Sequence, residues 1–264
     1  MVAAKDAKGD KRMTKQEILS AQAQHVVMKN ELIQNSRYNL GLLEQRALLY
    51  LISKIKPTDK PYTEYPFSID EFNKICKHTE RTGRYTEYAR NVLKSLNTKQ
   101  VEIQLDEHRR LITNWINEAV INDETGVVSI TFSKYLTPYL YELRQFYTSF
   151  CLEEVLAMNS KYGIRLFEYI KSIKSKGWKQ AVPLEELRIR MDCIEKYTEY
   201  KDFRKFALDP AVKDINTYTN IKISYEPIKV KKWVKAIQFT ILDVSSAEEL
   251  TARQIAKAEE IQPD

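Results

Sequence analysis

The chain has 264 residues, of which 43% are hydrophobic and 30% are charged, and its formal net charge is +6 at pH 7. This composition predicts about two globular domains and excludes a fibrous or low-complexity chain. Because no apolar run approaches the roughly 20 residues that cross a bilayer, we expect a cytoplasmic protein with no membrane partner. The positive charge favours a polyanionic partner, although many basic proteins bind none.

The cysteines and the two ends of the chain offer little chemistry. Cys76, Cys151 and Cys193 lie far apart and are odd in number, which argues against a disulfide framework and against a zinc site. We therefore expect free thiols, no metal and no cofactor. Residues 1–25 are expected to form a flexible N-terminal tail, and residues 246–264 a C-terminal tail.

The first predicted domain covers residues 26–140. Apolar residues at helical spacing give way to a period of two after Asn97, which is typical of strands. Ser68 followed by Glu71 predicts a capping box at a helix start. The predicted elements are helices at 30–35, 42–52, 69–76 and 85–96, and strands at 65–69, 101–105, 111–121 and 127–132.

The second predicted domain covers residues 141–245. A connecting helical region, expected over about 134–176, leads into it from the end of the first domain. Pro183 is well placed at a helix start. The elements expected after it are a short helix at 183–187, a long helix at 198–216, a strand at 221–225, a basic turn at 226–232 and a returning strand at 233–242.

The two domains share an order of elements and a short sequence. Tyr-Thr-Glu-Tyr occurs at Tyr85–Tyr88 and again at Tyr197–Tyr200, each time at or just before a long basic helix. In both domains a short helix precedes this long helix, and a β-ribbon follows it. That order is typical of a winged helix, which places its second helix in the major groove of DNA. We therefore predict an α+β protein with two winged-helix domains.

The long helix of the second domain is the predicted base-reading element. On a helical wheel Phe203, Phe206 and Ala207 fall on one side with Pro210 and Ala211, whereas the cations gather on the other side. The base-reading candidates are Tyr200, Lys201, Arg204 and Lys205, of which Arg204 can make a bidentate contact with guanine. The alternative interpretation is a solvated basic face. Pro210 must either kink this helix or follow a new start at Asp209.

Further cations are predicted to contact phosphate, which positions a protein on DNA without reading its sequence. They lie in the first domain, in the connecting region and in the basic turn. These candidates are Arg81, Arg84, Arg90, Lys94, Lys161, Arg165, Lys213, Lys229, Lys231 and Lys232.

Three separated motifs occur in order at Asn30–Arg46, Ser160–Glu168 and Phe203–Asn216. With these motifs the chain resembles the iteron-binding plasmid replication initiators of the RepB/RepE type, over about residues 26–243. The resemblance implies two winged-helix domains with pseudo-twofold similarity in a bacterial cytoplasmic protein. It also implies binding to directly repeated origin DNA, origin opening, and recruitment of the host initiator and the replicative helicase.

The resemblance further implies an equilibrium between monomers and dimers. Monomers would bind the iterons, and dimers formed through the first domain would repress the protein's own promoter. The second domain's long helix would be the main element of sequence specificity.

Three other functions compete with this interpretation. A tyrosine-dependent rolling-circle nicking enzyme is disfavoured because its metal-binding His-x-His pair is missing, since His25, His78 and His108 are scattered. An ATP-driven motor is disfavoured because no Gly-x4-Gly-Lys-Ser/Thr loop is present. We therefore expect no enzymatic activity. A plain winged-helix repressor is hard to separate from an initiator by sequence alone.

Overall fold

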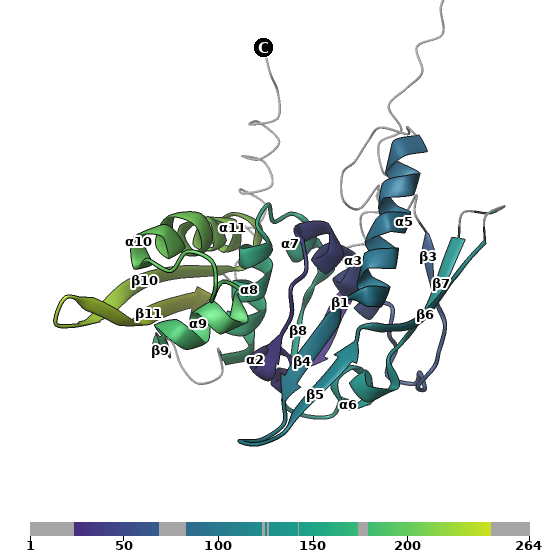
Figure 1. The fold of residues 1–264 in the computed structure, drawn as a ribbon, viewed down its shortest axis with the longest axis horizontal. Helices are drawn as coiled ribbons and strands as arrows, with labels where there is room; N and C mark the ends of the chain where they lie inside the picture. The colour runs from purple at the N-terminus through teal and green to yellow at the C-terminus, as the bar shows by residue number, and fades with distance from the viewer. Residues whose placement is uncertain are drawn as a thin grey trace, which may run out of the picture.

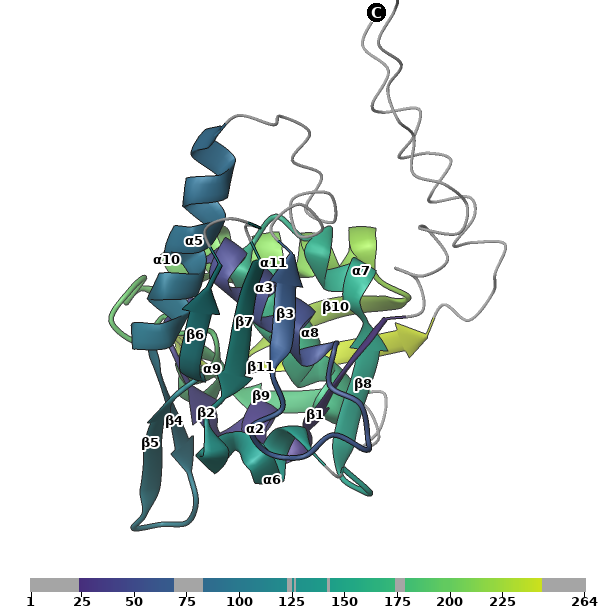
Figure 2. The ribbon, with the colours of Figure 1, turned by 90° about the vertical axis from the view of Figure 1, so that its right-hand side faces the viewer.

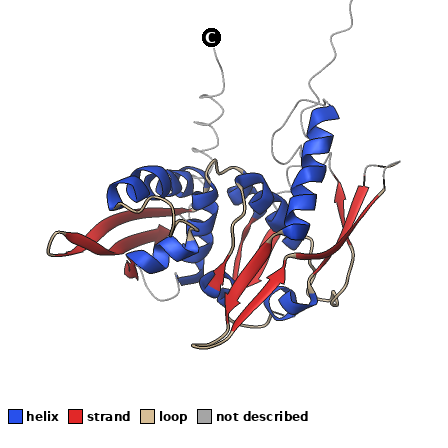
Figure 3. Cartoon of the chain, viewed as in Figure 1, coloured by secondary structure: helices blue, strands red, loops and turns tan. Residues whose placement is uncertain are grey.

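The computed structural model describes residues 24–68, 83–122, 125, 127–141, 143–173 and 179–243. Helices and strands are mixed throughout, in two lobes that meet at an upright central helix (Figures 1 and 3). The first lobe contains the elements from β1 to α7, and the second contains those from β9 to β11.

The elements of the first lobe are β1 (His25–Lys29), α2 (Asn30–Asn35), β2 (Ser36–Arg37), α3 (Leu42–Ile52), β3 (Tyr65–Ser68), α5 (Gly83–Thr98), β4 (Gln100–Gln104), β5 (Arg110–Asn114), β6 (Ile116–Ile121), β7 (Val127–Phe132), η1 (Lys134–Leu136), α6 (Thr137–Leu140), β8 (Tyr147–Cys151) and α7 (Leu152–Leu156). The central helix is α8 (Lys161–Ile173). The elements of the second lobe are β9 (Lys179–Pro183), α9 (Leu184–Arg190), α10 (Tyr200–Phe203), η3 (Arg204–Leu208), α11 (Asp209–Tyr218), β10 (Ile221–Val230) and β11 (Trp233–Asp243).

The sheets of the two lobes share one winged-helix topology. In the second lobe the strand order is β10-β11-β9, so the short strand before the helices pairs with the last strand of the hairpin. In the first lobe the order β3-β7-β6 repeats this arrangement around the long helix α5. A second hairpin, β4 with β5, follows α5 directly and projects from the lobe (Figure 2). The predicted pair of winged-helix domains is therefore confirmed.

Local patterning explains most of these elements. Strand β4 alternates buried Val101 and Ile103 with polar neighbours, as a half-buried strand requires. Helix α9 starts after Pro183, which lacks the backbone N–H that the first turn of a helix leaves unpaired. The expected helix at 69–76 and the capping box of Ser68 and Glu71 lie outside the described side chains. The expected tails at 1–25 and 246–264 lie outside the described residues too, except for Gln24 and for His25, which begins β1.

Three expectations from the sequence differ from the structure. The connecting region is not wholly helical, because β8 lies within it and pairs antiparallel with β1. The strand predicted at 111–121 is divided at Trp115, which is buried and separates β5 from β6. The predicted turn at 226–232 is mostly strand: β10 and β11 pair up to Val230 and Trp233, leaving a two-residue turn.

Helix α8 joins the two lobes through a continuous core. Ile164, Leu166 and Phe167 are completely buried, and α8 contacts α11 on one side and α2, α3 and β8 on the other. Asp214 of α11 accepts the backbone N–H groups of Asn159 and Ser160 at 2.8 and 2.7 Å, just before α8 begins. These contacts fix the second lobe to the helix that also supports the first.

Glycine is required on α8 where this helix meets α11. A Cβ atom added at Gly163 would lie only 3.0 Å from Cβ and from Oδ2 of Asp214. The absence of a side chain at this position therefore permits the close approach of the two helices.

Candidate nucleic-acid interface

The predicted base-reading helix is one continuous rod made of α10, η3 and α11, which we call the long helix. Its middle section η3 is a π-helical turn, in which the N–H of Asp209 donates to the carbonyl of Arg204 five residues earlier. Pro210 follows in the first turn of α11, where its missing backbone N–H costs no helical hydrogen bond. The long helix accommodates Pro210 by widening one turn and then beginning a new α-helical segment at Asp209.

The inner side of the long helix packs into the core, and its outer side carries the cations. Phe203, Ala207, Leu208, Ala211 and Ile215 are completely buried. The exposed cations of the outer side are Lys201, Arg204, Lys205 and Lys213. The structure thus places three of the four base-reading candidates on one accessible surface.

Arg204 is held by two residues that the sequence did not single out. Its Nε lies 3.6 Å from Oδ2 of Asp209, and the Tyr225 hydroxyl on β10 donates to the other oxygen of that carboxylate. Burial and this hydrogen bond raise the pKa of the Tyr225 hydroxyl, so it remains a donor. Because this ion pair uses Nε, the edge formed by Nη1 and Nη2 stays available, and that edge is the fork that can recognise guanine.

Tyr200 is less available than the sequence suggested. Its ring packs against the core, and its hydroxyl oxygen is buried with no hydrogen-bond partner among the described residues. Burial raises the pKa of this hydroxyl. A contact between the Tyr200 hydroxyl and DNA would therefore require the side chain to move, and only part of its ring is accessible.

The predicted wing, the basic turn at 226–232, lies at the exposed end of the β10–β11 hairpin. Lys229, Lys231 and Lys232 are all exposed there, and Lys231 adopts a left-handed backbone conformation with φ of 55°. Three apolar side chains accompany them, because Ile228, Val230 and the adjacent Trp233 are 38%, 56% and 58% exposed. The wing extends away from the second lobe beyond the long helix (Figure 1).

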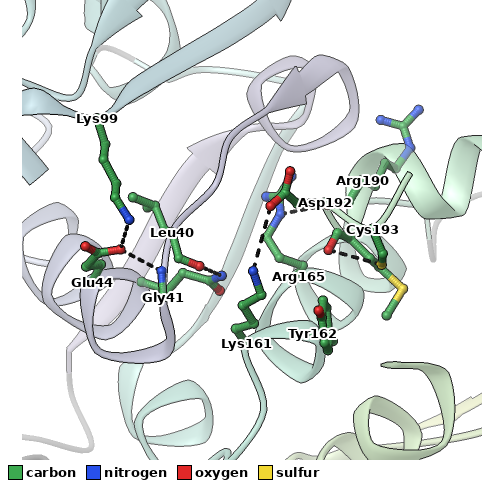
Figure 4. A network of polar contacts seen from close by, with 12 residues as sticks. Leu40, Gly41, Glu44, Lys99, Lys161, Tyr162, Arg165, Arg190, Asp192 and Cys193 are labelled. Atoms are coloured by element: carbon green, nitrogen blue, oxygen red, sulfur yellow. Dashed lines mark hydrogen bonds and ion pairs between the residues drawn. The ribbon is translucent and has the colours of Figure 1, made fainter. Parts of the chain in front are cut away.

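Arg165 is the clear error among the phosphate candidates. It is only 4% exposed, and its guanidinium donates to Tyr38, Glu168 and the carbonyls of Ser36 and Arg190. The guanidinium carbon also lies 4.0 Å from the centroid of the Tyr38 ring. Arg165 is thus a core residue that ties α8 to both lobes, and it has no access to phosphate. Figure 4 shows Arg165 beside Arg190 of the second lobe.

Lys161 is also engaged within the protein. Its Nζ lies 3.7 Å from Oδ2 of Asp192 and 5.3 Å from the Tyr162 ring centroid (Figure 4). Burial lowers the pKa of this ammonium, although the Asp192 carboxylate opposes the shift. A phosphate contact by Lys161 would therefore compete with its ion pair.

The first-domain candidates are described only in part. Lys94 is exposed on α5, and Arg90 is partly buried on the same helix. Arg84 belongs to α5, but its side chain lies outside the described part of the structure, and so does all of Arg81. These four candidates therefore do not yet define a surface comparable with that of the long helix.

Two further observations concern other classes of site. Within the described residues, no group of three or more histidine, cysteine or acidic side chains is arranged to hold a metal ion. In the same part of the chain, no helix combines the length and apolarity that a membrane span requires.

Comparisons with known proteins agree with this architecture. Residues 25–171 match the family described as initiator replication protein, WH1, and residues 183–241 match its WH2 counterpart. An Escherichia coli replication initiation protein is 28% identical over 207 residues, which are 75% of this chain and 64% of the relative. The crystal structure of the Pi initiator protein in complex with iteron DNA has the same fold, with a TM-score of 0.68 at 15% identity, covering 85% of this chain and 99% of that one.

The fold and the cationic long helix define a protein with two winged-helix domains in tandem. The first family match includes α8, which the sequence pattern had placed in the second domain. Because the two matches together cover most of the chain, it belongs to the initiator replication protein family.

Proposed function

We propose that this protein binds directly repeated origin DNA, the iterons, and starts plasmid replication there. Base reading by the long helix would supply specificity, while the wing and the exposed cations of the first domain contact phosphate. The observation that carries the proposal is the exposed Arg204 guanidinium on a winged helix, which pairs through Nε with Asp209, while Tyr225 donates a hydrogen bond to the same carboxylate. The Pi initiator, whose fold is similar, was solved bound to iteron DNA, which supports the choice of ligand.

We propose the remaining parts of the function as well, and the chain's membership in the initiator family supports them. The protein helps to open the origin and recruits the host initiator and the replicative helicase. As a dimer formed through its first domain it represses its own promoter. It acts by binding alone and has no DNA-cleaving activity.

Binding to the DNA that flanks the gene tests the proposal. We expect the full chain to retard duplexes containing tandem repeats from this region at physiological salt, and to bind shuffled repeats at least 1,000-fold more weakly, on the order of the usual specificity ratio. Equal retardation of both duplexes would refute sequence-specific binding. Preference for an inverted repeat alone would instead indicate a plain repressor.

A second assay addresses cleavage. Supercoiled DNA carrying the repeats is incubated with the protein and a divalent metal ion, and then denatured. We expect neither nicked DNA nor a covalent adduct between tyrosine and DNA. An adduct would show that the protein is a nicking enzyme.

A further inference from the structure

Phe206 occupies an unexpected position on the long helix. Helical periodicity predicts it on the buried side together with Phe203 and Ala207, yet its side chain is 46% exposed. The π-helical turn explains this difference, because the wider turn brings both Ala207 and Leu208 into the core. Phe206 is thereby displaced to the outer flank, beside Lys205.

The exposed ring is nevertheless held in place. It stacks on the ring of Tyr197, with centroids 5.5 Å apart and an interplanar angle of 27°. Tyr197 in turn meets the edge of Tyr162, with centroids 6.2 Å apart, and Tyr162 is almost fully buried on α8. This aromatic stack of Tyr162, Tyr197 and Phe206 connects the flank of the long helix to the centre of the molecule. An ordered side chain loses little conformational entropy when it binds.

The surroundings of Phe206 favour DNA as its ligand. The Nζ atom of Lys205 lies 5.0 Å from the Phe206 ring centroid, and the exposed Arg204 lies on the other flank of Lys205. An apolar group among cations suits the major groove, where phosphates line the edges and one base feature is apolar. That feature is the 5-methyl group of thymine, for which phenylalanine is a known partner.

We propose that Phe206 contacts the 5-methyl group of a thymine in the site that the long helix enters, and that it thereby sets part of the sequence specificity. This inference rests on the proposed function, since it requires the long helix to enter the major groove. It extends that function by naming a chemical group on the DNA and the side chain that recognises it.

The test removes the methyl group from the DNA and the ring from the protein. The probe is a duplex that the full chain selects from random-sequence DNA. Each thymine in it is replaced singly by deoxyuridine, and dissociation constants are measured for the wild type, Phe206→Ala and Phe206→Leu. Thermal unfolding of all three proteins serves as the control for folding.

At one thymine we expect the wild type to lose about fourfold in affinity, which is the effect of exposing one buried methyl group. Phe206→Ala should bind the thymine and deoxyuridine duplexes equally at that position, whereas Phe206→Leu should retain part of the difference. At the remaining thymines, replacement should affect all three proteins alike.

Two results would overturn the inference in distinguishable ways. If the wild type selects a duplex, but no thymine shows an effect that depends on residue 206, Phe206 does not read a methyl group and the proposed function stands. If no preferred duplex can be selected, sequence-specific binding itself fails, and this inference fails with it.

Discussion

Arg204 illustrates how a neighbouring carboxylate turns a flexible cation into a directional group. Arginine loses conformational freedom when it binds, and a guanidinium that is already oriented loses less. Asp209 and Tyr225 supply this orientation from the two elements that flank the exposed surface, the long helix and β10. The three residues act as a unit in which only Arg204 would touch the DNA bases.

This unit gives a graded prediction. Arg204→Ala should weaken binding to the repeat duplex by about 1–3 kcal/mol and leave binding to random DNA almost unchanged. Tyr225→Phe removes only the hydroxyl that holds Asp209 and should cost about 0.5–1.5 kcal/mol on the same duplex. Titrations with both duplexes measure these effects. The control is Lys94→Ala, which removes a proposed phosphate contact and should weaken binding to both duplexes alike. Equal losses on repeat and random DNA would show that Arg204 contacts phosphate alone.

The negative charge of Glu44 contributes to the stability of the first domain. Its carboxylate accepts from Lys99 Nζ at 2.6 Å and from the backbone N–H of Gly41 at 2.6 Å, and also from Ser95 (Figure 4). Partial burial acts to raise the pKa of Glu44, but these hydrogen bonds outweigh it and hold the pKa below its ordinary value. The ionised carboxylate therefore stabilises the folded state.

The sign of the pH dependence follows from this lowered pKa. The contribution is present above the unfolded-state pKa of about 4.3 and is lost as the pH falls through the lower folded-state pKa. Glu44→Gln should therefore lower the free energy of unfolding by about 1–2 kcal/mol at pH 7. Urea unfolding of the wild type and Glu44→Gln is measured from pH 3 to pH 7. The difference between their free energies of unfolding should shrink below about pH 4. A difference independent of pH would mean that shape, rather than charge, is what the variant disturbs.

At the scale of elements, the end of the β10–β11 hairpin combines three lysines with three exposed apolar side chains on paired strands. A β-ribbon is about as wide as the major groove and wider than the minor groove of about 6 Å. The lysines are therefore expected to meet phosphates along the groove edges.

Salt dependence tests this role of the wing. Replacing both Lys231 and Lys232 by alanine should reduce the slope of log K against log salt concentration by about 0.9 for each phosphate that the protein no longer neutralises. Affinity for repeat and random duplexes should fall by similar factors. A slope equal to that of the wild type would exclude both lysines from the interface.

The elements also show where sequence patterns suffice and where they do not. Local periodicity predicted α3, α5, β7 and the start of α9, because each depends on neighbours close in the sequence. Strand β8 was not predicted, because its partner β1 lies more than 100 residues away in the sequence. Pairing over such a distance leaves little local signal.

The candidate site was predictable to a similar extent. The exposed cations of the long helix follow from its amphipathic pattern, and Arg204 was correctly placed on the outer side. Phe206 was assigned to the wrong side because a wheel with 100° per residue assumes no π-helical turn. Arg165 was misassigned because its burial depends on Tyr38 and on Arg190, which belong to different lobes.

At the scale of the whole molecule, Arg165 couples the two domains through α8. Its guanidinium reaches the carbonyl of Ser36 in the first lobe and that of Arg190 in the second. Beside it, burial raises the pKa of Glu168 even though the Arg165 charge opposes the shift. Loss of Arg165 would leave this carboxylate buried without a cationic partner.

Arg165→Ala should therefore destabilise the protein by about 3–5 kcal/mol at pH 7. The loss should be smaller near pH 4, where Glu168 is protonated in both the folded and the unfolded states, and it should grow as the pH rises. Calorimetry should show both domains melting earlier, whereas the exposed control Lys213→Ala should leave the transition unchanged. A shift confined to one domain would contradict the coupling.

The π-helical turn also sets the rotational phase between the two halves of the long helix. Between the cations at the start of the long helix and Lys213, the π-helical turn holds one residue more than an α-helical turn would. If this turn closed into ordinary α-helical bonding with no change in sequence, one half of the long helix would turn by about 100° against the other. The cations would then point in different directions around the axis, so this one turn fixes which of them share a face.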